Sequence, residues 1–340
     1  MFGGILITSR GAVACRMEAT LRRMRIRAAA IYSEGDRDSL HVRQADEAIL
    51  VGSYGSVEQV VDAAFQAGAQ AIHPGDGPLS EASELAEACA ARGIVFIGPT
   101  PEQLRIFGER LSGENDAADR IAQQIGIALA SSAEVVRPRH IAVQIFGDGT
   151  GAVVALGELD CAAQRSGVTV IGETPAPGLN LDAREKLRAA AIGIGKAVRY
   201  RSAGTVEFIY DKDTEDFYFL RVTPHLQPEH ALCEETTGVD LVEWMVRLAA
   251  GELPRLDRMR IRVAGCALQA RIAAEDPARN FQPVLGHLAQ VEWPAGARID
   301  TWVESGLDVT SGCDPTLAQI LVRAGDRAAA LRRLSHALAH

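Results

Sequence analysis

Several residue types that carry chemistry in proteins occur in this chain, and their spacing decides which chemistry is open to them. The run Q-P-E-H at 227–230 brings an amide, a carboxylate and an imidazole close together along the chain. A carboxylate with charged neighbours can be tuned to transfer protons. The six cysteines stand far apart without a C-x-x-C pair, and no Cys and His residues have metal-ligand spacing. We therefore expect free thiols in a reducing cytoplasm and no zinc site.

Glycine is abundant, but its positions predict turns rather than a phosphate-binding loop. Gly75–Gly77 follows an expected strand. Gly147–Gly151 lies between two expected strands, where Asp-Gly supplies the positive φ angles of a tight hairpin turn. No other Gly-rich run occurs, so the sequence lacks the loop whose backbone N–H groups cradle nucleotide phosphates.

Two differently built parts of the chain must position these side chains. Residues 1–108 alternate short apolar runs with helical patterns, at a spacing typical of a doubly wound, Rossmann-like parallel sheet in an α/β fold. Residues 101–126 are predicted to be helical, and 127–139 to form a short joint. Strands are expected at 5–8, 26–32, 70–73 and 94–97, and helices at 13–24, 57–67 and 79–92.

From His140 onward the pattern predicts an α+β part with antiparallel strands. One hairpin is expected from strands 141–146 and 152–156, and a second from strands 205–210 and 216–221. The region Asn180-Leu181-Asp182 offers a polar cap for a helix. Helices are expected at 181–199, 239–250 and 325–339, and further strands at 261–272, 287–293, 297–303 and 317–323.

Length and composition fit a protein of two or three packed lobes. The chain has 340 residues, of which 47% are apolar, and a net charge of -9 with its basic residues scattered. This balance argues against a nucleic-acid partner and against an anionic membrane surface. No run approaches the roughly 20 apolar residues of a membrane span, and the start of the chain does not predict a signal peptide.

An ordered set of motifs connects both parts with one known family. The first part contains I-L-I-T-S-R-G-A-V-A at 5–14, H-P-G-D-G-P-L-S-E at 73–81 and F-I-G-P at 96–99. The second contains A-G-T-V-E-F at 203–208, Q-P-E-H at 227–230, T-G-V-D-L-V-E-W-M at 237–245, R-I-A-A-E-D-P at 271–277 and A-R-I-D-T-W-V at 297–303. In this order they resemble the biotin carboxylase family of the ATP-grasp superfamily. The last stretches are similar to the biotin carboxylase part of urea carboxylase.

The resemblance implies an N-terminal domain, an ATP-grasp core and a C-terminal domain. We expect the N-terminal domain at 1–108, a helical connector at 109–139, and the core with a truncated C-terminal domain at 140–340. The family's central lid lobe carries the Gly-rich loop and the lysine that grip ATP phosphates. That lobe has no counterpart here, because the chain passes from helix 101–126 almost directly to Arg137-Pro138-Arg139-His140.

The family's metal site needs two carboxylates and an amide, the oxygen ligands that Mg²⁺ or Mn²⁺ prefers. The resemblance places Glu207 at the first carboxylate, but Arg221 at the second and Thr223 at the amide. A guanidinium cannot ligate a cation, so we expect Arg221 to pair with Glu207 through a charge-assisted hydrogen bond where the metal would lie. In the alternative, Arg221 turns outward to solvent.

Other charged positions of the family are replaced as well. The lysine that holds bicarbonate corresponds to Thr169, a nearby arginine to His225, and a lysine of the N-terminal domain to Arg110. The turn glutamate of the family's N-R-G-E run corresponds to Ala12. These changes remove cationic groups that would stabilise a carboxyphosphate-like charge. His225 either titrates near neutral pH or is a structural side chain.

Part of the family's bicarbonate and biotin site is kept. Gln227 and Glu229 match the family's Q-V-E-H run, with Glu229 in the place of the general base. Arg298 matches the arginine assigned to the biotin enolate, and His140 and His230 match cofactor-binding positions. These residues form either a working proton-transfer corner or a structural ion pair that remains after the function was lost.

Three functions are therefore open. The first is a non-catalytic interaction or regulatory homologue of a biotin-dependent carboxylase, with neither ATP nor a metal cofactor expected. The second is an enzyme that uses Glu229, Arg298 and Gln227, either with a lid supplied by a partner or on a carboxylated or urea-like substrate without ATP. The third is a sensor of small anions. The resemblance implies a homodimer, and biotin would come from a biotin carboxyl carrier or carboxylase subunit because no Met-Lys acceptor motif occurs.

Overall fold

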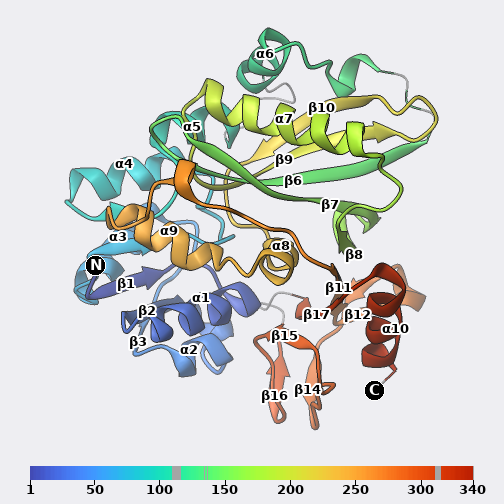
Figure 1. The fold of residues 1–340 in the computed structure, drawn as a ribbon. Coiled ribbons are helices and arrows are strands. Elements are labelled where there is room, and N and C mark those ends of the chain that lie inside the picture. Colours follow the sequence, from blue (N-terminus) through green and yellow to red (C-terminus); the bar gives the residue numbers. More distant parts are fainter. Residues whose placement is uncertain (109–115, 134, 136, 311–314, 340) are drawn as a thin grey trace.

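The computed structural model describes residues 1–340 except 109–115, 134, 136, 311–314 and 340 (Figure 1). Two sheets form the framework: a five-stranded sheet from the N-terminal part and an eight-stranded sheet from the rest of the chain. In Figure 1 the first sheet lies at the lower left, and the second runs from β10, β9, β6 and β7 in the upper half down to β11, β17 and β15 in the lower half. The predicted change of architecture along the chain is confirmed.

The N-terminal sheet is parallel, with the strand order β3-β2-β1-β4-β5. Its alternating side chains explain the helices on both faces: Ile5 packs with Met17 of α1, whereas Leu6 packs with Val60 of α3 and Leu85 of α4. The predicted doubly wound sheet is confirmed, although β3 and α2 were not predicted. The elements are β1 (Gly4–Ile7), α1 (Gly11–Arg23), β2 (Arg27–Tyr32), α2 (Leu40–Gln44), β3 (Glu47–Leu50), α3 (Val57–Gln66), β4 (Ala71–His73), α4 (Ser83–Ala91) and β5 (Val95–Phe96).

The helical stretch predicted at 101–126 is two helices, α5 (Pro101–Phe107) and α6 (Asp116–Gln124). A capping box between Thr100 and Gln103 fixes the start of α5, where Pro101 occupies the first turn. Between α5 and β6, the described residues form α6 and one short 3-10 turn (Ala130–Ser132), and none of them lies in a named strand. The described part of this stretch therefore contains no sheet-bearing lobe.

The second sheet is antiparallel, with the order β10-β9-β6-β7-β8-β11-β17-β15. Both predicted hairpins are confirmed, as is the cap of α7, where the Asn180 side chain accepts a hydrogen bond from the Ala183 N–H. Strand β8 was not predicted, because half of its positions are exposed or nearly so. The elements are β6 (Pro138–Asp148), β7 (Val153–Arg165), β8 (Val168–Thr174), α7 (Leu181–Ala197), β9 (Arg201–Asp211) and β10 (Phe217–Thr223).

Two helices join this sheet to the N-terminal part. The first, α8 (His230–Thr237), was not predicted and ends at Gly238, which takes a left-handed φ of 73°. The second, α9 (Leu241–Ala249), starts at the Asp240 cap, two residues later than predicted. Leu232 of α8 and Val242 of α9 share one core with Ile5 and Met17, so these helices tie the two parts together.

The C-terminal elements complete the second sheet. Helix α10 (Arg327–Leu338) packs on β11 (Cys266–Ala273) and β17 (Thr316–Ala324). The strand predicted at 261–272 begins only at Cys266, and the one predicted at 287–293 is only β14 (Gly286–Leu288), because none of the residues 261–265 and 289–293 is buried. The remaining elements are β12 (Glu275–Asp276), β13 (Gln282–Pro283), β15 (Arg298–Thr301) and β16 (Leu307–Val309).

Candidate functional site

A cavity of about 360 Å³ lies where the N-terminal part, the antiparallel sheet and the C-terminal strands meet. Its walls come from the start of α1, from strands β6, β9, β10, β11, β15 and β17, and from the segment that leads into α8. Predicted site residues that line this cavity are Ala12, His140, Thr169, Glu207, Arg221, His225, Gln227, Glu229 and His230. Elements far apart in the sequence thus bring most of the predicted residues together.

Strand register explains why Glu207 and Arg221 meet. Arg221 of β10 lies directly opposite Glu207 of β9, and residues directly opposite in an antiparallel pair have neighbouring side chains. Thr223 shares a face with Arg221 because the side chains of a strand alternate. On the other side of β9, Glu207 pairs with Ala142 of β6, which makes His140 its diagonal neighbour.

Protein groups contact both oxygens of the Glu207 carboxylate. Oε2 lies 2.8 Å from His140 Nε2 and 2.9 Å from Arg221 Nε. Oε1 accepts hydrogen bonds from the Thr223 hydroxyl at 2.7 Å and from Gln227 Nε2 at 3.4 Å. Two carboxylate oxygens offer about four acceptor sites, and three of these accept hydrogen bonds from protein groups.

The pairing of Arg221 differs in one respect from the charge-assisted hydrogen bond that we expected. Its Nε approaches Glu207 at ion-pair distance, but the N–H is not aligned for a hydrogen bond. The side chain is also 36% exposed, so the guanidinium meets both Glu207 and the cavity. The contact is an ion pair at the edge of the cavity.

The surroundings of Glu207 favour its charged form. Burial raises the pKa of Glu207, but the hydrogen bond from His140 and the charge of Arg221 outweigh burial and lower this pKa to about 2. His140 accepts a hydrogen bond from the Gln164 amide at Nδ1, which leaves its Nε2–H to donate to Glu207. The cluster is an internally neutralised charge network.

These residues do not fit the metal site of an ATP-grasp enzyme. Glu207 already accepts three hydrogen bonds and pairs with Arg221, and a guanidinium and a hydroxyl stand where a second carboxylate and an amide are needed. In the described part of the chain, no group of three or more His, Cys, Asp or Glu side chains could hold a metal ion.

The cavity is lined by four arginines but by no lysine. The sequence has three lysines, Lys186, Lys196 and Lys212, which lie on α7 and in the turn after β9. None of them lines the cavity. Arg110, the counterpart of one family lysine, lies outside the described residues.

Glu229 faces the cavity beside a hydroxyl instead of a cation. Burial raises the pKa of Glu229, and a hydrogen bond with the Thr169 side chain only partly offsets this. Thr169 also bonds to the buried Cys161, whose pKa burial raises well above its usual value. At the position where the family has a lysine, Thr169 therefore holds a carboxyl and a thiol that both resist ionisation.

Arg298 is not part of this cavity. Its guanidinium binds Asp300 at 2.7 Å, Glu234 at 3.0 Å and Glu235 at 3.3 Å, and it lines a separate surface depression with Arg323 and other residues. The structure thus brings Gln227 and Glu229 together but leaves Arg298 engaged elsewhere. Each carboxylate is an acceptor for charge-assisted bonds, so Arg298 is held firmly.

The two remaining predicted histidines have protein partners. His230 is buried and donates its Nδ1–H to the Gln227 carbonyl at 2.8 Å, and burial lowers its pKa. His225 Nδ1 lies 3.1 Å from Glu81 Oε1. Both rings lie in the wall of the cavity and connect the 225–230 segment to its surroundings.

Sequence reasoning missed several polar residues of the cavity. Arg10, Arg16 and Arg271 line it together with Gln164 and Gln319. Arg10 and Arg271 stand inside motifs that resemble the family, so the motifs themselves were the available signal. What the sequence could not supply was the approach of α1 to β11 and β17, elements more than 200 residues apart.

Comparisons with known proteins agree with this architecture. Residues 1–104 match the biotin carboxylase N-terminal domain, residues 128–257 the ATP binding domain of the carbamoyl-phosphate synthase L chain, and residues 269–340 the biotin carboxylase C-terminal domain. A parallel N-terminal sheet followed by this antiparallel ATP-binding core defines an ATP-grasp protein.

Individual relatives are more specific. The chain is 37% identical to urea amidolyase of Saccharomyces cerevisiae, over 99% of this chain and 22% of the relative. The crystal structure of Kluyveromyces lactis urea carboxylase is 42% identical with a TM-score of 0.93, over 99% of this chain and 30% of that one. The biotin carboxylase domain of Hydrogenobacter thermophilus 2-oxoglutarate carboxylase is 30% identical with a TM-score of 0.89, over 99% and 90%. This chain belongs to the biotin carboxylase family.

The predicted family and the likeness to urea carboxylase are therefore confirmed. The chain spans less than a third of the urea amidolyase and urea carboxylase chains. The match to the yeast protein extends over 410 residues, whereas this chain has 340, so at least 70 positions of the match have no counterpart here. The division at residues 108 and 139 remains a prediction.

Proposed function

We propose that this chain is a non-catalytic member of the biotin carboxylase family, which acts as an interaction or regulatory homologue of a biotin-dependent carboxylase. The proposal includes a cytoplasmic location and a homodimer. In this chain, Ala12 and Arg221 stand at positions where the resemblance implies carboxylates. In the described residues, no helix is long and apolar enough to cross a membrane.

The observation that carries the proposal is that protein side chains surround the Glu207 carboxylate. A metal ion would have to displace His140, Arg221, Thr223 and Gln227 from its oxygens. Displacement would leave the half-buried Arg221 guanidinium beside a divalent cation, and like charges at such a distance repel. Magnesium that carries a nucleotide therefore has no favourable position in this cleft.

The lack of a lysine at the cavity supports the same proposal. The H. thermophilus relative was crystallised with MgADP and bicarbonate. Here the cavity has no lysine, and Thr169 is a hydroxyl close to Glu229. Transfer of a phosphoryl group requires cations placed around the transferring charge, and a lid that excludes water.

The enzyme alternative is weaker on this geometry. It requires Glu229, Gln227 and Arg298 around one pocket, but Arg298 does not line the cavity and is bound to three carboxylates. Glu229 also lies beside the Thr169 hydroxyl, where the resemblance implies a lysine. The three residues of the enzyme alternative therefore do not surround one pocket.

Calorimetric titration with Mg·ATP tests the proposal. We expect no binding heat up to millimolar nucleotide, and no release of phosphate in the presence of bicarbonate and biotin. The catalytically competent control is a biotin carboxylase relative in the same buffer. Micromolar binding of Mg·ATP by this chain, or phosphate release that the Glu229→Gln variant abolishes, would contradict the proposal.

A further inference from the structure

The Arg221 side chain gives the cavity a cationic group at a position where a metal-binding relative needs an anionic one. Among the described residues, its ion-pair partner is Glu207, which its Nε faces. The side chain is 36% exposed and lines the cavity. A guanidinium carries five N–H donors, so its terminal N–H groups are available to a bound molecule.

The three other arginines of the cavity have protein partners, and Arg10 Nη1 lies 3.9 Å from Asp36. Arg16 Nη2 lies 3.0 Å from Glu234 and 3.0 Å from Asp240. Arg271 Nε donates to the Thr316 hydroxyl at 2.7 Å. Arg221 is therefore better placed than either of them to donate to a molecule in the cavity. Guanidinium groups bind carboxylates through two parallel hydrogen bonds, which gives them both strength and orientation.

The rest of the cavity limits the size and type of the molecule. A volume of about 360 Å³ is near the lower end of small-molecule pockets, so it suits a molecule with few carbon atoms. The amides of Gln164 and Gln227 and the hydroxyl of Thr169 add uncharged polar groups to the walls.

We infer that this cavity binds a small organic carboxylate without a metal ion, and that Arg221 holds the carboxylate group. The inference rests on the proposed loss of metal and nucleotide binding, because it gives the same cleft an organic anion as its ligand. It differs from bicarbonate binding at the inherited corner, since Gln227 and Glu229 do not supply the anchoring charge. The carboxylate would lie beside Arg221 at the mouth of the Glu207 cluster.

Thermal shift and calorimetry with succinate as the probe test this inference, in buffer that contains EDTA. A ligand that binds only the folded state raises the melting temperature. We expect millimolar succinate to raise the melting temperature of the wild type, and the uncharged analogue succinamide to leave it unchanged. The comparison between these two molecules needs no variant, so it remains decisive if a substitution at position 221 prevents folding.

Variants then locate the anchoring group. We expect Arg221→Gln to weaken succinate binding at least about tenfold, since a charge-assisted bidentate contact is lost. Arg137→Gln is the matched control, because Arg137 is an exposed arginine at the start of β6 whose partner is Asp213, outside the cavity. That variant is expected to bind succinate like the wild type.

Several results would overturn the inference. They are the absence of any succinate effect on the wild type, equal effects of succinate and succinamide, and undiminished binding by a folded Arg221→Gln variant. Stabilisation by bicarbonate that Arg221→Gln leaves unchanged, with none by succinate, would assign the cavity to the inherited corner instead. Micromolar Mg·ATP binding is a separate result: it would contradict the proposed function while the succinate comparison still decides the carboxylate site.

Discussion

Two substitutions on one strand account for most of the chemistry at Glu207. Arg221 and Thr223 lie two residues apart on β10, so alternation places both side chains on the face that Glu207 occupies. One supplies a positive charge at 2.9 Å and the other a hydroxyl donor at 2.7 Å. The neighbouring strand thus supplies the cation and the hydrogen-bond donor that stabilise the buried carboxylate.

The pH dependence of stability tests this pairing. The pKa of Glu207 falls from 4.5 to about 2 in the folded protein, so folding favours the deprotonated carboxylate. Its contribution, about 3 kcal/mol at neutral pH, is present above pH 4.5 and is lost as the pH falls through about 2. We expect the difference in unfolding free energy between wild type and Glu207→Gln to be about 2 kcal/mol smaller at pH 3 than at pH 7.

Urea denaturation at the two pH values provides the measurement. Glu185→Gln is the control, because Glu185 is an exposed residue of α7 and its substitution should change stability little at either pH. A difference for Glu207→Gln that does not depend on pH would show that Glu207 does not have a lowered pKa in the folded protein.

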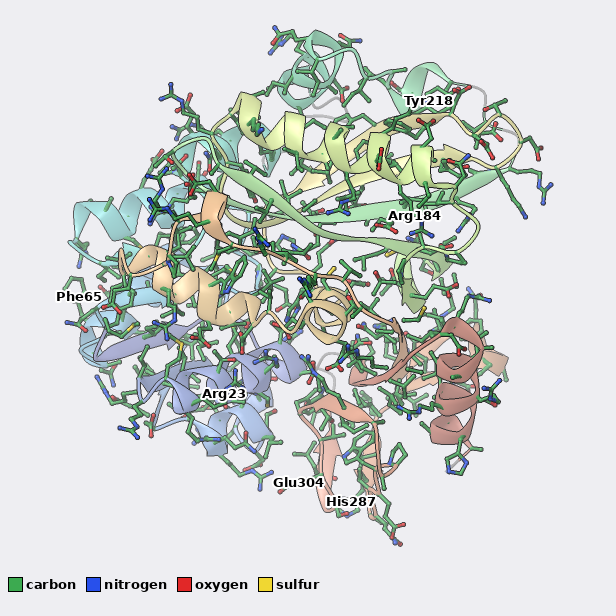
Figure 2. All side chains as sticks on the ribbon, in the orientation of Figure 1. Arg23, Phe65, Arg184, Tyr218, His287 and Glu304 are labelled. Atoms are coloured by element: carbon green, nitrogen blue, oxygen red, sulfur yellow. The ribbon has the colours of Figure 1, made fainter. Side chains whose placement is uncertain are left out.

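Helix α1 joins the N-terminal sheet to α8 and α9 through buried charges. Arg16 of α1 contacts Glu234 of α8 and the Asp240 cap of α9, and its side chain is 11% exposed. Arg23 of the same helix also pairs with Asp240, but it is 58% exposed and lies at the surface of the molecule (Figure 2). The two arginines therefore share one partner and differ mainly in burial.

This difference predicts unequal effects of the same substitution. Arg16→Gln should lower the free energy of unfolding by about 3 kcal/mol, because it removes the buried cation that Glu234 and Asp240 share. Arg23→Gln should cost less than about 1 kcal/mol, as is usual for exposed ion pairs. Chemical denaturation of the two variants checks this, and equal losses would show that the buried network does not connect the two parts as described.

The sequence predicted those elements whose signals are local. Asp148-Gly149 marks a hairpin turn, and the Asn180 cap starts α7, because the energetics of turns and caps depend on a few adjacent residues. Strand β8 escaped prediction because its exposed side chains give no clear alternation, and its place beside β11 comes from tertiary pairing. Strand pairing of this kind cannot be predicted from a short stretch of sequence.

The candidate site was predictable to a similar degree. The family motifs identified Glu207, Arg221, Gln227 and Glu229, and the structure places all four at one cavity. The position of Arg298 was not predictable, because two of its partners, Glu234 and Glu235, belong to the unpredicted helix α8. Because this helix was not predicted, the carboxylates that orient Arg298 could not be recognised from the sequence.

At the scale of the whole molecule, the two sheets keep the arrangement of biotin carboxylases. The TM-score to K. lactis urea carboxylase is 0.93 over 99% of this chain, although at least 70 positions of the match to the yeast protein are missing. The fold therefore persists without them, because its cores lie within the N-terminal sheet and the antiparallel sheet. Conservation of a fold does not preserve the chemistry of its site.

The most direct test of this account counts the manganese bound at Glu207. Electron paramagnetic resonance distinguishes free Mn²⁺ from protein-bound Mn²⁺ in the presence of ATP, and Mn²⁺ prefers the same oxygen ligands as Mg²⁺. We predict that the wild-type chain leaves the free Mn·ATP signal unchanged, as does the Glu207→Gln variant. A protein-bound signal in the wild type that disappears in Glu207→Gln would contradict the account, since it would place a metal on the carboxylate that Arg221 neutralises here.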